Sequence, residues 1–485
     1  MNKKIGWKFD NTYARLPKNI LRKIKPDSVK KPKIVIFNHE LAENLGLNFS
    51  NIASDELSAI FSGNSLPEKS ECIAQAYAGH QFGHFAVLGD GRAIIIGEHV
   101  TKNNKRVDIQ FKGSGKTPYS RNGDGKAVLG PMLREYIISE AMHGLKIPTT
   151  RSLAVTETGE KVLREIPMKG AILTRVADSH IRVGTFQYVA MTEDEKTLKT
   201  LFDYTISRHY PDIKKSENCA IELLKIVMKK QAELVTDWMR VGFIHGVMNT
   251  DNMTISGETI DYGPCAFMDS YNPQTVFSSI DHYGRYAYFN QPIITHWNLA
   301  RFAETLLPLI HKNKKIAIQM TKETINSFTS IFKGCWMKMM RKKLGFFGEE
   351  NEDEELINDL LSLMEKGKLD YTNTFVSLIK KDISKNELFN NQGLVDWHEK
   401  WKKRLSKNNG KIDSSINLMK STNPSIIPRN HIVEKILKSA ENEDLLPLKN
   451  LIEVLKNPYN HQLKDSEYQS SPPPGSENYK TFCGT

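Results

Sequence analysis

One segment says most about the fold of this chain: His245-Gly246-Val247-Met248-Asn249-Thr250-Asp251-Asn252. It is followed, nine residues later, by Asp261-Tyr262-Gly263. Side chains of Asn and Asp offer hard oxygen ligands, which suit Mg²⁺ or Mn²⁺. Asn-Thr-Asp-Asn is also good turn chemistry, so a purely structural turn is the alternative. We predict that Asn252 and Asp261 bind a metal ion and that Asp251 acts as a general base.

The order of these residues is that of a protein-kinase catalytic loop followed by its metal-binding Asp. One position departs from that pattern, because Val247 stands two residues after His245, where a kinase has its catalytic Asp. Three hypotheses follow. The chain is an enzyme whose base is Asp251, a conventional ATP-dependent phosphotransferase, or a catalytically inactive kinase-like nucleotide-binding module.

The region before this segment has the pattern of a β-rich domain. Residues 85–88, 93–96 and 106–112 predict a three-stranded meander, with Gly89-Asp90-Gly91 as the first hairpin turn. Further strands are expected at 152–155, 161–164 and 171–176, and a helix at 128–143. After about residue 180 the pattern is helical, with long helices expected at 220–241, 295–311, 316–343 and 355–367.

These elements predict an α+β class and a bilobal protein-kinase-like fold. We expect an N-terminal extension at 1–80, a β-rich N-lobe at 81–178, a larger helical C-lobe at 179–393, and a C-terminal helical region with a flexible tail at 394–485.

Two motifs in the β-rich region suggest other functions. Gly113-Ser114-Gly115-Lys116-Thr117 resembles a P-loop, but Gln110 replaces its first Gly and Pro118 follows where a helix should begin. His80-Gln81-Phe82-Gly83-His84 has the histidine spacing of a zinc helix, but Gln81 replaces the catalytic Glu. We therefore reject a P-loop and a zinc site.

Lys112 ends the last strand of the expected meander, where it could bind phosphate if a carboxylate from the next helix held it. Glu135 is the candidate because it shares a helical stripe with Ile138 and Met142, and Glu140 is the alternative. Arg175 and Arg182 flank the expected junction of the lobes, where two guanidinium groups could clamp a polyphosphate. Ordinary salt-bridge arginines are the alternative.

Longer motifs resemble the selenoprotein O family, kinase-like protein adenylyltransferases (AMPylators). They are Phe9-Asp10-Asn11-Thr12-Tyr13-Ala14-Arg15-Leu16-Pro17, Ala74-Gln75-Ala76-Tyr77-Ala78-Gly79-His80-Gln81-Phe82-Gly83, Leu88-Gly89-Asp90-Gly91-Arg92, Gln110-Phe111-Lys112-Gly113-Ser114-Gly115, Thr117-Pro118-Tyr119-Ser120-Arg121, Gly123-Asp124-Gly125, His245-Gly246, Asp251-Asn252 and Ile260-Asp261-Tyr262-Gly263-Pro264. The last third of the chain resembles the family less distinctively.

The resemblance implies that ATP binds in reversed orientation and that AMP passes to Ser, Thr or Tyr hydroxyls of proteins, with release of pyrophosphate. It implies that Asp251 is the proton acceptor, that Asn252 and Asp261 bind Mg²⁺ or Mn²⁺, and that Glu135 supports Lys112. The residues implied to contact ATP are Gly89, Gly91, Arg92, Lys112, Asp124, Gly125, Arg175, Arg182 and Asp261. Neither the metal nor a preference for ATP over nucleotides such as UTP follows from the sequence.

Some eukaryotic members of this family carry selenocysteine near the C-terminus, where this chain has Cys483. This difference indicates a prokaryotic-type member. We hypothesise that Cys483 forms a regulatory disulfide with Cys265; an inert tail cysteine is the alternative.

The composition favours a globular protein, with 39% hydrophobic and 25% charged residues. The net charge of +11 comes from scattered lysines, so we expect no nucleic-acid partner. No apolar run is long enough to span a membrane, and the first residues are a poor secretory signal. We expect a cytoplasmic monomer with protein substrates.

Overall fold

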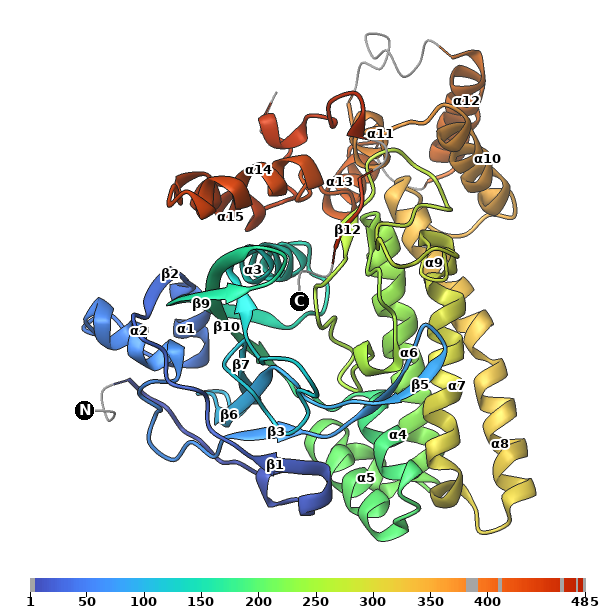
Figure 1. Cartoon of the computed structure of the whole chain (residues 1–485). Helices are drawn as coiled ribbons and strands as arrows, with labels where there is room; N and C mark the ends of the chain where they lie inside the picture. Colours follow the sequence, from blue (N-terminus) through green and yellow to red (C-terminus); the bar gives the residue numbers. More distant parts are fainter. Residues whose placement is uncertain (1–4, 381–390, 409–411, 463–465, 477–478, 483–485) are drawn as a thin grey trace.

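The computed structural model describes residues 5–380, 391–408, 412–462, 466–476 and 479–482 and has a mixed α/β fold. Its main sheet has the order β1-β3-β6-β7-β10-β9-β2, and β8 pairs with β10 (Figure 1). The bounds are β1 (Leu21–Lys23), β2 (Lys33–Phe37), β3 (Ile73–Gln75), β6 (Ala93–Val100), β7 (Arg106–Lys112), β8 (Ala127–Val128), β9 (Arg151–Leu163) and β10 (Pro167–Ala177). All the pairings in this sheet are antiparallel.

The expected meander is wrong in one strand. β6 and β7 form the predicted hairpin, but the other neighbour of β6 is β3. The strand expected at 85–88 is β5 (His84–Val87), which pairs with β4 (Ala78–Gln81) in a separate two-stranded sheet. The histidines of the rejected zinc motif therefore lie on this hairpin and not on a helix.

The first 75 residues contribute more regular structure than the sequence predicted. β1 and β3 extend one side of the main sheet, and β2 forms its other edge beside β9. Helices α1 (His39–Leu45) and α2 (Ser54–Ser62) bring side chains such as Phe61 against Ile94 and Phe111 of the sheet. These strands are only three to five residues long, so their sequence signal is weak.

Helix α3 (Leu129–Gly144) was predicted almost to the residue, and it packs against β9 and β10. Its other neighbours come from the far end of the sequence, α14 (Asn430–Glu441) and α15 (Leu446–Leu455). Leu133, Ile137 and Leu448 are fully buried in the resulting core. This packing fixes the helix that carries Glu135.

The predicted helical region is present, with one division that the sequence did not reveal. The helices are α4 (Val183–Met191), α5 (Glu195–His209), α6 (Cys219–Arg240), α7 (Gln291–Ile310), α8 (Lys314–Asn326), α9 (Phe328–Lys343), α10 (Asp353–Lys366), α11 (Tyr371–Leu378), α12 (Gln392–Ser406) and α13 (Ile412–Thr422). The single helix expected at 316–343 is broken at Ser327 into α8 and α9. α6 lies at the centre, against α7 and α9.

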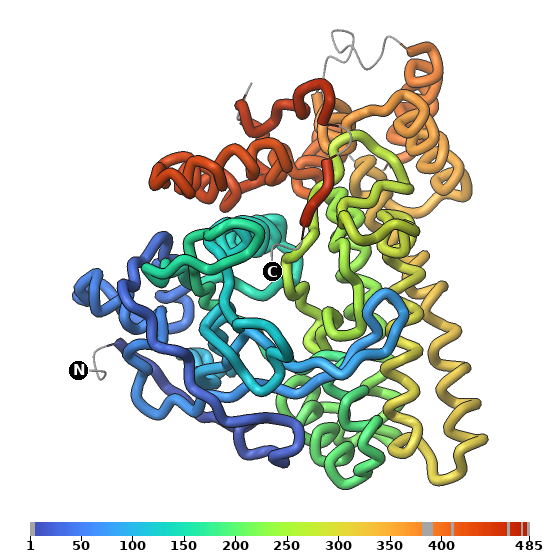
Figure 2. Tube along the Cα trace, viewed as in Figure 1, coloured from blue at the N-terminus to red at the C-terminus, as the bar shows by residue number. Residues whose placement is uncertain are grey.

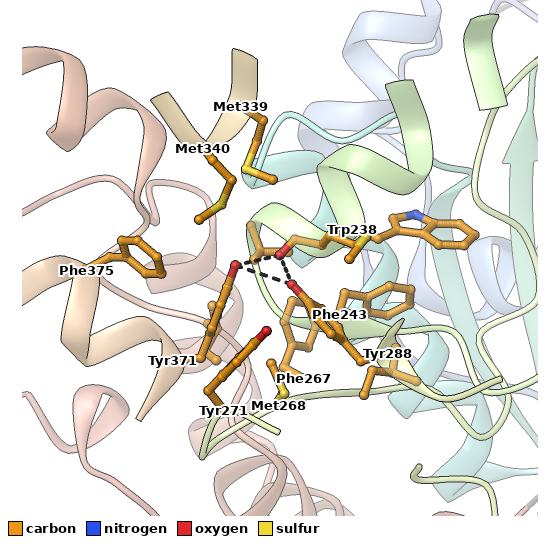
Figure 3. Close-up of a cluster of buried hydrophobic side chains, with 14 of the residues drawn as sticks. Trp238, Phe243, Phe267, Met268, Tyr271, Tyr288, Met339, Met340, Tyr371 and Phe375 are labelled. Atoms are coloured by element: carbon orange, nitrogen blue, oxygen red, sulfur yellow. Dashed lines mark hydrogen bonds between the residues drawn. The ribbon is translucent and has the colours of Figure 1, made fainter. Parts of the chain in front are cut away.

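An aromatic and methionine cluster supports the end of α6 that leads to segment 245–265 (Figure 3). The hydroxyl groups of Tyr288 and Tyr371 both donate to the carbonyl oxygen of Met239, each at 2.8 Å. Phe243 follows on β11 (Phe243–Ile244), which pairs with β12 (Ala266–Phe267). The segment 245–265 is therefore held at both ends by buried structure. None of the described helices is both long enough and apolar enough to cross a bilayer.

Candidate nucleotide-binding and transfer site

Four charged side chains meet in one cluster: two from neighbouring strands, one from α3 and one from the segment that contains Asp261. Lys112 Nζ, at the end of β7, lies 2.6 Å from Glu135 Oε2 of α3 and 2.7 Å from Asp261 Oδ1. Arg175 of β10 also contacts both carboxylates, with its Nε 3.0 Å from Glu135 Oε1 and its Nη2 2.6 Å from Asp261 Oδ1. The structure therefore selects Glu135 over Glu140, which pairs with Arg151 instead.

The cluster keeps its carboxylates ionised although they are buried. Burial alone would raise the pKa of Glu135 and Asp261. The guanidinium of Arg175 and the ammonium of Lys112 outweigh that effect at both sites, so the pKa of Glu135 is lowered and that of Asp261 lies well below its usual value. Two cations facing two anions are thus fixed at the end of β7.

Arg182 lies at the N-terminal end of α4 and is almost completely buried. Its guanidinium stacks on Tyr77 at 4.3 Å from the ring centroid, and Nη2 lies 3.8 Å from Asp90 Oδ1. Nη1 donates to the backbone carbonyl of Asp251 at 3.2 Å. Arg182 therefore joins the turn after β5 to the segment that contains Asp251.

Asp251 lies in the 3₁₀ turn Thr250–Asn252, where turn chemistry was the alternative to a functional role in the sequence. The residue is 7% exposed, and its Oδ1 accepts no hydrogen bond from the described residues. Burial raises the pKa of Asp251 to about 6, while the positive charge of Arg182 opposes the rise. A carboxylate with this pKa is largely ionised at neutral pH and can accept a proton.

The backbone around Asp251 leaves no room for a side chain beside its carboxylate. A Cβ atom added at Gly79 would overlap Oδ1 of Asp251, and one added at Gly184 would lie 3.2 Å from Cα of Asp251. His245 is buried nearby and donates from Nε2 to the Ile260 carbonyl oxygen at 2.9 Å, which ties the two halves of the segment together. His245 is therefore a structural group here.

The donor atoms at Asn252 and Asp261 fit a hard divalent cation. Asn252 Nδ2 donates to the Val247 carbonyl oxygen at 3.0 Å, which leaves Oδ1 buried and without a partner among the described residues. Asp261 uses only Oδ1 for Lys112 and Arg175, and its side chain is 30% exposed. Both residues therefore have an oxygen to offer, although no group of three or more His, Cys, Asp or Glu residues in the described chain forms a metal cluster.

The family model described as "Protein adenylyltransferase SelO" matches residues 3–456. The chain belongs to this family. It is 60% identical over 481 residues to the "Protein nucleotidyltransferase YdiU" of Pelagibacter ubique (strain HTCC1062), covering 99% of this chain and all of that protein. Proteins of the same name from Nitrosococcus oceani and Bacillus cytotoxicus are 58% and 55% identical, each covering 99% of this chain and 98% of their own length.

Other residues that the family resemblance assigned to ATP lie around the loop that follows β7. Gly89 and Gly91 leave space for Tyr119, because a Cβ atom at either position would overlap its side chain or backbone. Gly125 packs on Gly115, whose N–H donates to the Gly125 carbonyl oxygen at 3.1 Å. Asp124 is 2.9 Å from Arg164 at the surface. Their contact with ATP remains a prediction.

A cavity of about 700 Å³ opens beside the charged cluster, and Arg92, Lys112 and Glu135 line part of it. Its opposite wall includes α14 and the tail segment from Tyr479 to Phe482. Thr481 holds this tail in place: its N–H donates to the Phe277 carbonyl oxygen at 2.8 Å and its Oγ1 to that of Pro264 at 2.7 Å. The tail therefore lies directly beside the Asp-Tyr-Gly segment.

Cys265 lies next to that tail contact and is fully buried, and burial raises its pKa to about 12. A thiol with so high a pKa is a poor nucleophile. Cys483, its hypothetical disulfide partner, lies outside the described residues, so the disulfide remains a prediction.

Sequence reasoning missed Asp90, Tyr77 and Gly79. Asp90 is buried and accepts the Gln75 N–H at 2.9 Å, and burial raises its pKa to about 6 although Arg182 opposes the rise. The sequence predicts a hairpin turn at Gly89-Asp90-Gly91, where an exposed Asp is expected. The signal available in the sequence was only a carboxylate between two glycines.

Proposed function

We propose that the chain transfers AMP from ATP to Ser, Thr or Tyr hydroxyls of proteins and releases pyrophosphate. Membership of the family makes it a nucleotidyltransferase. The observation that carries the proposal is the Asp251 carboxylate, which is buried and lacks a partner at Oδ1, on a residue whose backbone carbonyl accepts a hydrogen bond from Arg182. It supplies the base that Val247 cannot.

In the proposed reaction, the acceptor hydroxyl gives its proton to Asp251 as its oxygen forms a bond to the α-phosphorus of ATP. The bond between that phosphorus and the bridging oxygen to the β-phosphate breaks, and both electrons leave with pyrophosphate. Lys112, Arg175 and Arg182 would hold the polyphosphate and stabilise the negative charge that leaves. Arg92, Gly89, Gly91, Asp124 and Gly125 would contact the rest of the nucleotide.

Mg²⁺ or Mn²⁺ would bind to Asn252 and Asp261 together with phosphate oxygens, and when bound it would neutralise phosphate charge. Lys112 already neutralises one oxygen of Asp261 and so keeps this carboxylate in place. Glu135 fixes Lys112 and Arg175 from the other side.

We further propose a bilobal kinase-like arrangement, with an N-lobe at 81–178, a C-lobe at 179–393, and terminal regions at 1–80 and 394–485. The position of Lys112 and Glu135 on a strand and a helix ahead of the catalytic segment supports it. We also propose a cytoplasmic monomer that acts on proteins and not on nucleic acid.

Incubation with ATP labelled in the α- or the γ-phosphate, followed by intact-mass measurement, tests the function. We expect protein-bound label only from the α-position and a mass gain of one adenylyl group. Label from the γ-position would identify a phosphotransferase instead, and ATP binding without any transfer would identify an inactive binding module.

A further inference from the structure

The β4–β5 hairpin stands apart from the main sheet and crosses toward the helices that hold the catalytic segment (Figure 2). β4 lies against that segment, because the His80 N–H donates to Thr250 Oγ1 at 2.7 Å and Gly79 abuts the Asp251 carboxylate. His80 also contacts Gln187 of α4 at 2.8 Å and Trp297 of α7. The hairpin is thus anchored by β4 at the proposed base.

β5 forms the outer strand of this hairpin, and its free edge follows from the register. The Leu88 N–H donates to the Tyr77 carbonyl oxygen at 2.9 Å, so the hydrogen-bonded pairs are the alternate ones that include Gly79 with Ala86. The backbone groups of Phe85 and Val87 therefore point away from β4. In the described part of the chain, neither residue has a hydrogen-bond partner for those groups.

The side chains along this edge are apolar and accessible. Phe85 is 45% exposed and Val87 52%, on a strand of only four residues. On α7, which the hairpin contacts through His80 and Trp297, Ile293 is also 54% exposed, one turn before Trp297. An exposed strand edge with apolar side chains is a template for pairing with another extended chain.

A cation without a carboxylate partner lies at the turn of the hairpin. The guanidinium of Arg285 is positioned over Trp297, 5.0 Å from the ring centroid, and faces Gly83. No ion pair of Arg285 occurs among the described residues, and its Nε has no hydrogen-bond partner there. The nearby Arg301, by contrast, is paired with Glu304 at 2.6 Å. Arg285 can therefore receive a carboxylate from outside.

We propose that the free edge of β5 binds an extended segment of the acceptor protein as a third strand, with an acidic side chain of that segment on Arg285. The proposal rests on the proposed protein adenylyltransferase function. In such strand addition, backbone hydrogen bonds supply affinity and alternate side chains supply specificity. Strands lie about 4.8 Å apart, so the added strand would run about 10 Å from β4, where Asp251 lies. A short turn beyond the strand would carry an acceptor Ser, Thr or Tyr across that distance to the base.

Val87→Pro is the sharpest variant, because it removes the outward N–H while leaving every hydrogen bond between β4 and β5. Proline is tolerated at such edge positions. Val87→Thr is its matched control, since it keeps the N–H and strand propensity. Arg285→Gln tests the acidic contact, with Arg301→Gln as the control for a nearby arginine that already has a partner.

The probe is a pool of random 12-residue peptides with a central Tyr, made with an ordinary backbone or with alternate N-methylated residues. Binding by fluorescence anisotropy is measured separately from AMP transfer. We expect ordinary peptides to bind at least tenfold more tightly than N-methylated ones, Val87→Pro to abolish that difference and Val87→Thr to retain it. Captured peptides should be rich in Asp and Glu, and Arg285→Gln, but not Arg301→Gln, should remove this enrichment.

Equal binding of the two pools, no peptide capture, or Val87→Pro binding as well as Val87→Thr would overturn strand addition. Equal capture of acidic and neutral peptides by the unmodified protein would overturn the Arg285 contact. Peptide binding without AMP transfer would leave strand addition supported and count against the proposed function. Equal rates of AMP transfer to whole proteins by Val87→Pro and Val87→Thr would support the proposed function and count against strand addition.

Discussion

Lys112 and Arg175, which lie on adjacent strands, form ion pairs with the same two carboxylates, those of Glu135 and Asp261. Neither cation is committed to a single partner. Glu135 can therefore keep both in place while the second oxygen of Asp261 stays available for the proposed metal ion. The two carboxylates thereby fix the positions of two cations where the polyphosphate is proposed to bind.

Glu135→Gln should remove the support of both cations. Breaking a buried ion pair by loss of one partner costs about 3–5 kcal/mol, so we expect urea unfolding to show a loss of about that size. The Michaelis constant for ATP should rise at least tenfold. Glu140→Gln, on the same helix but bound to Arg151, should leave that constant unchanged. An unaltered ATP constant in Glu135→Gln would contradict the supporting role.

Asp251→Asn should abolish AMP transfer while ATP still raises the thermal unfolding temperature. The amide keeps the size of the side chain but cannot accept the hydroxyl proton. General-base catalysis contributes about 10²–10⁴-fold, so a fall of that order is expected in the rate of α-label incorporation. A rate within threefold of the unmodified protein would rule out Asp251 as the base.

Gly79→Ala should inactivate the protein from a position that has no chemical group of its own. Its methyl group would overlap Oδ1 of Asp251 and displace the carboxylate. Gly334→Ala is the matched control, because an added Cβ there meets nothing within 4 Å and lies in a helix, where Ala is favoured by about 0.5–1 kcal/mol. Near-normal transfer by Gly79→Ala would show that the fit around Asp251 is looser than the structure indicates.

Glu258 gives a pH dependence of stability with a defined sign. Its Oε2 accepts the Asp178 N–H at 2.9 Å, and burial together with the Asp178 charge raises its pKa to about 8. Between its ordinary pKa and about 8 the folded state holds a proton that unfolding releases, so stability falls as pH rises. The slope is at most about 1.4 kcal/mol per pH unit.

Glu258→Gln should flatten this slope, because the amide is neutral throughout the range. The measurement is urea unfolding at pH 5, 6.5 and 8, with Glu323→Gln on the exposed face of α8 as the control. Parallel pH dependences in the unmodified protein and Glu258→Gln would refute the assignment.

The parts of the site that the sequence predicted are those encoded by local pattern. The stripe of α3 identified Glu135 because helical periodicity decides which side chains point inward, and the turn around Asp251 follows from its own residues. Pairing between distant strands is not encoded in this way. Nothing within residues 85–88 reveals that their partner is 78–81 and not 93–96.

The same reason explains why Asp90 and Gly79 were missed. Their importance comes from contacts with Arg182 and Asp251, which lie far along the chain. The break between α8 and α9 at Ser327 also lacks a proline or glycine, so the helical pattern runs through it without interruption.

The tail contact at Thr481 has a consequence for synthesis on the ribosome. Residues 479–482 complete one wall of the cavity beside Lys112, and they are made after almost everything else in the printed sequence. Domains fold as units while the chain emerges, so the sheet and the catalytic segment can assemble first. The cavity then gains this wall only after residues 479–482 have been made, so a chain that has emerged only as far as residue 470 would lack a finished pocket.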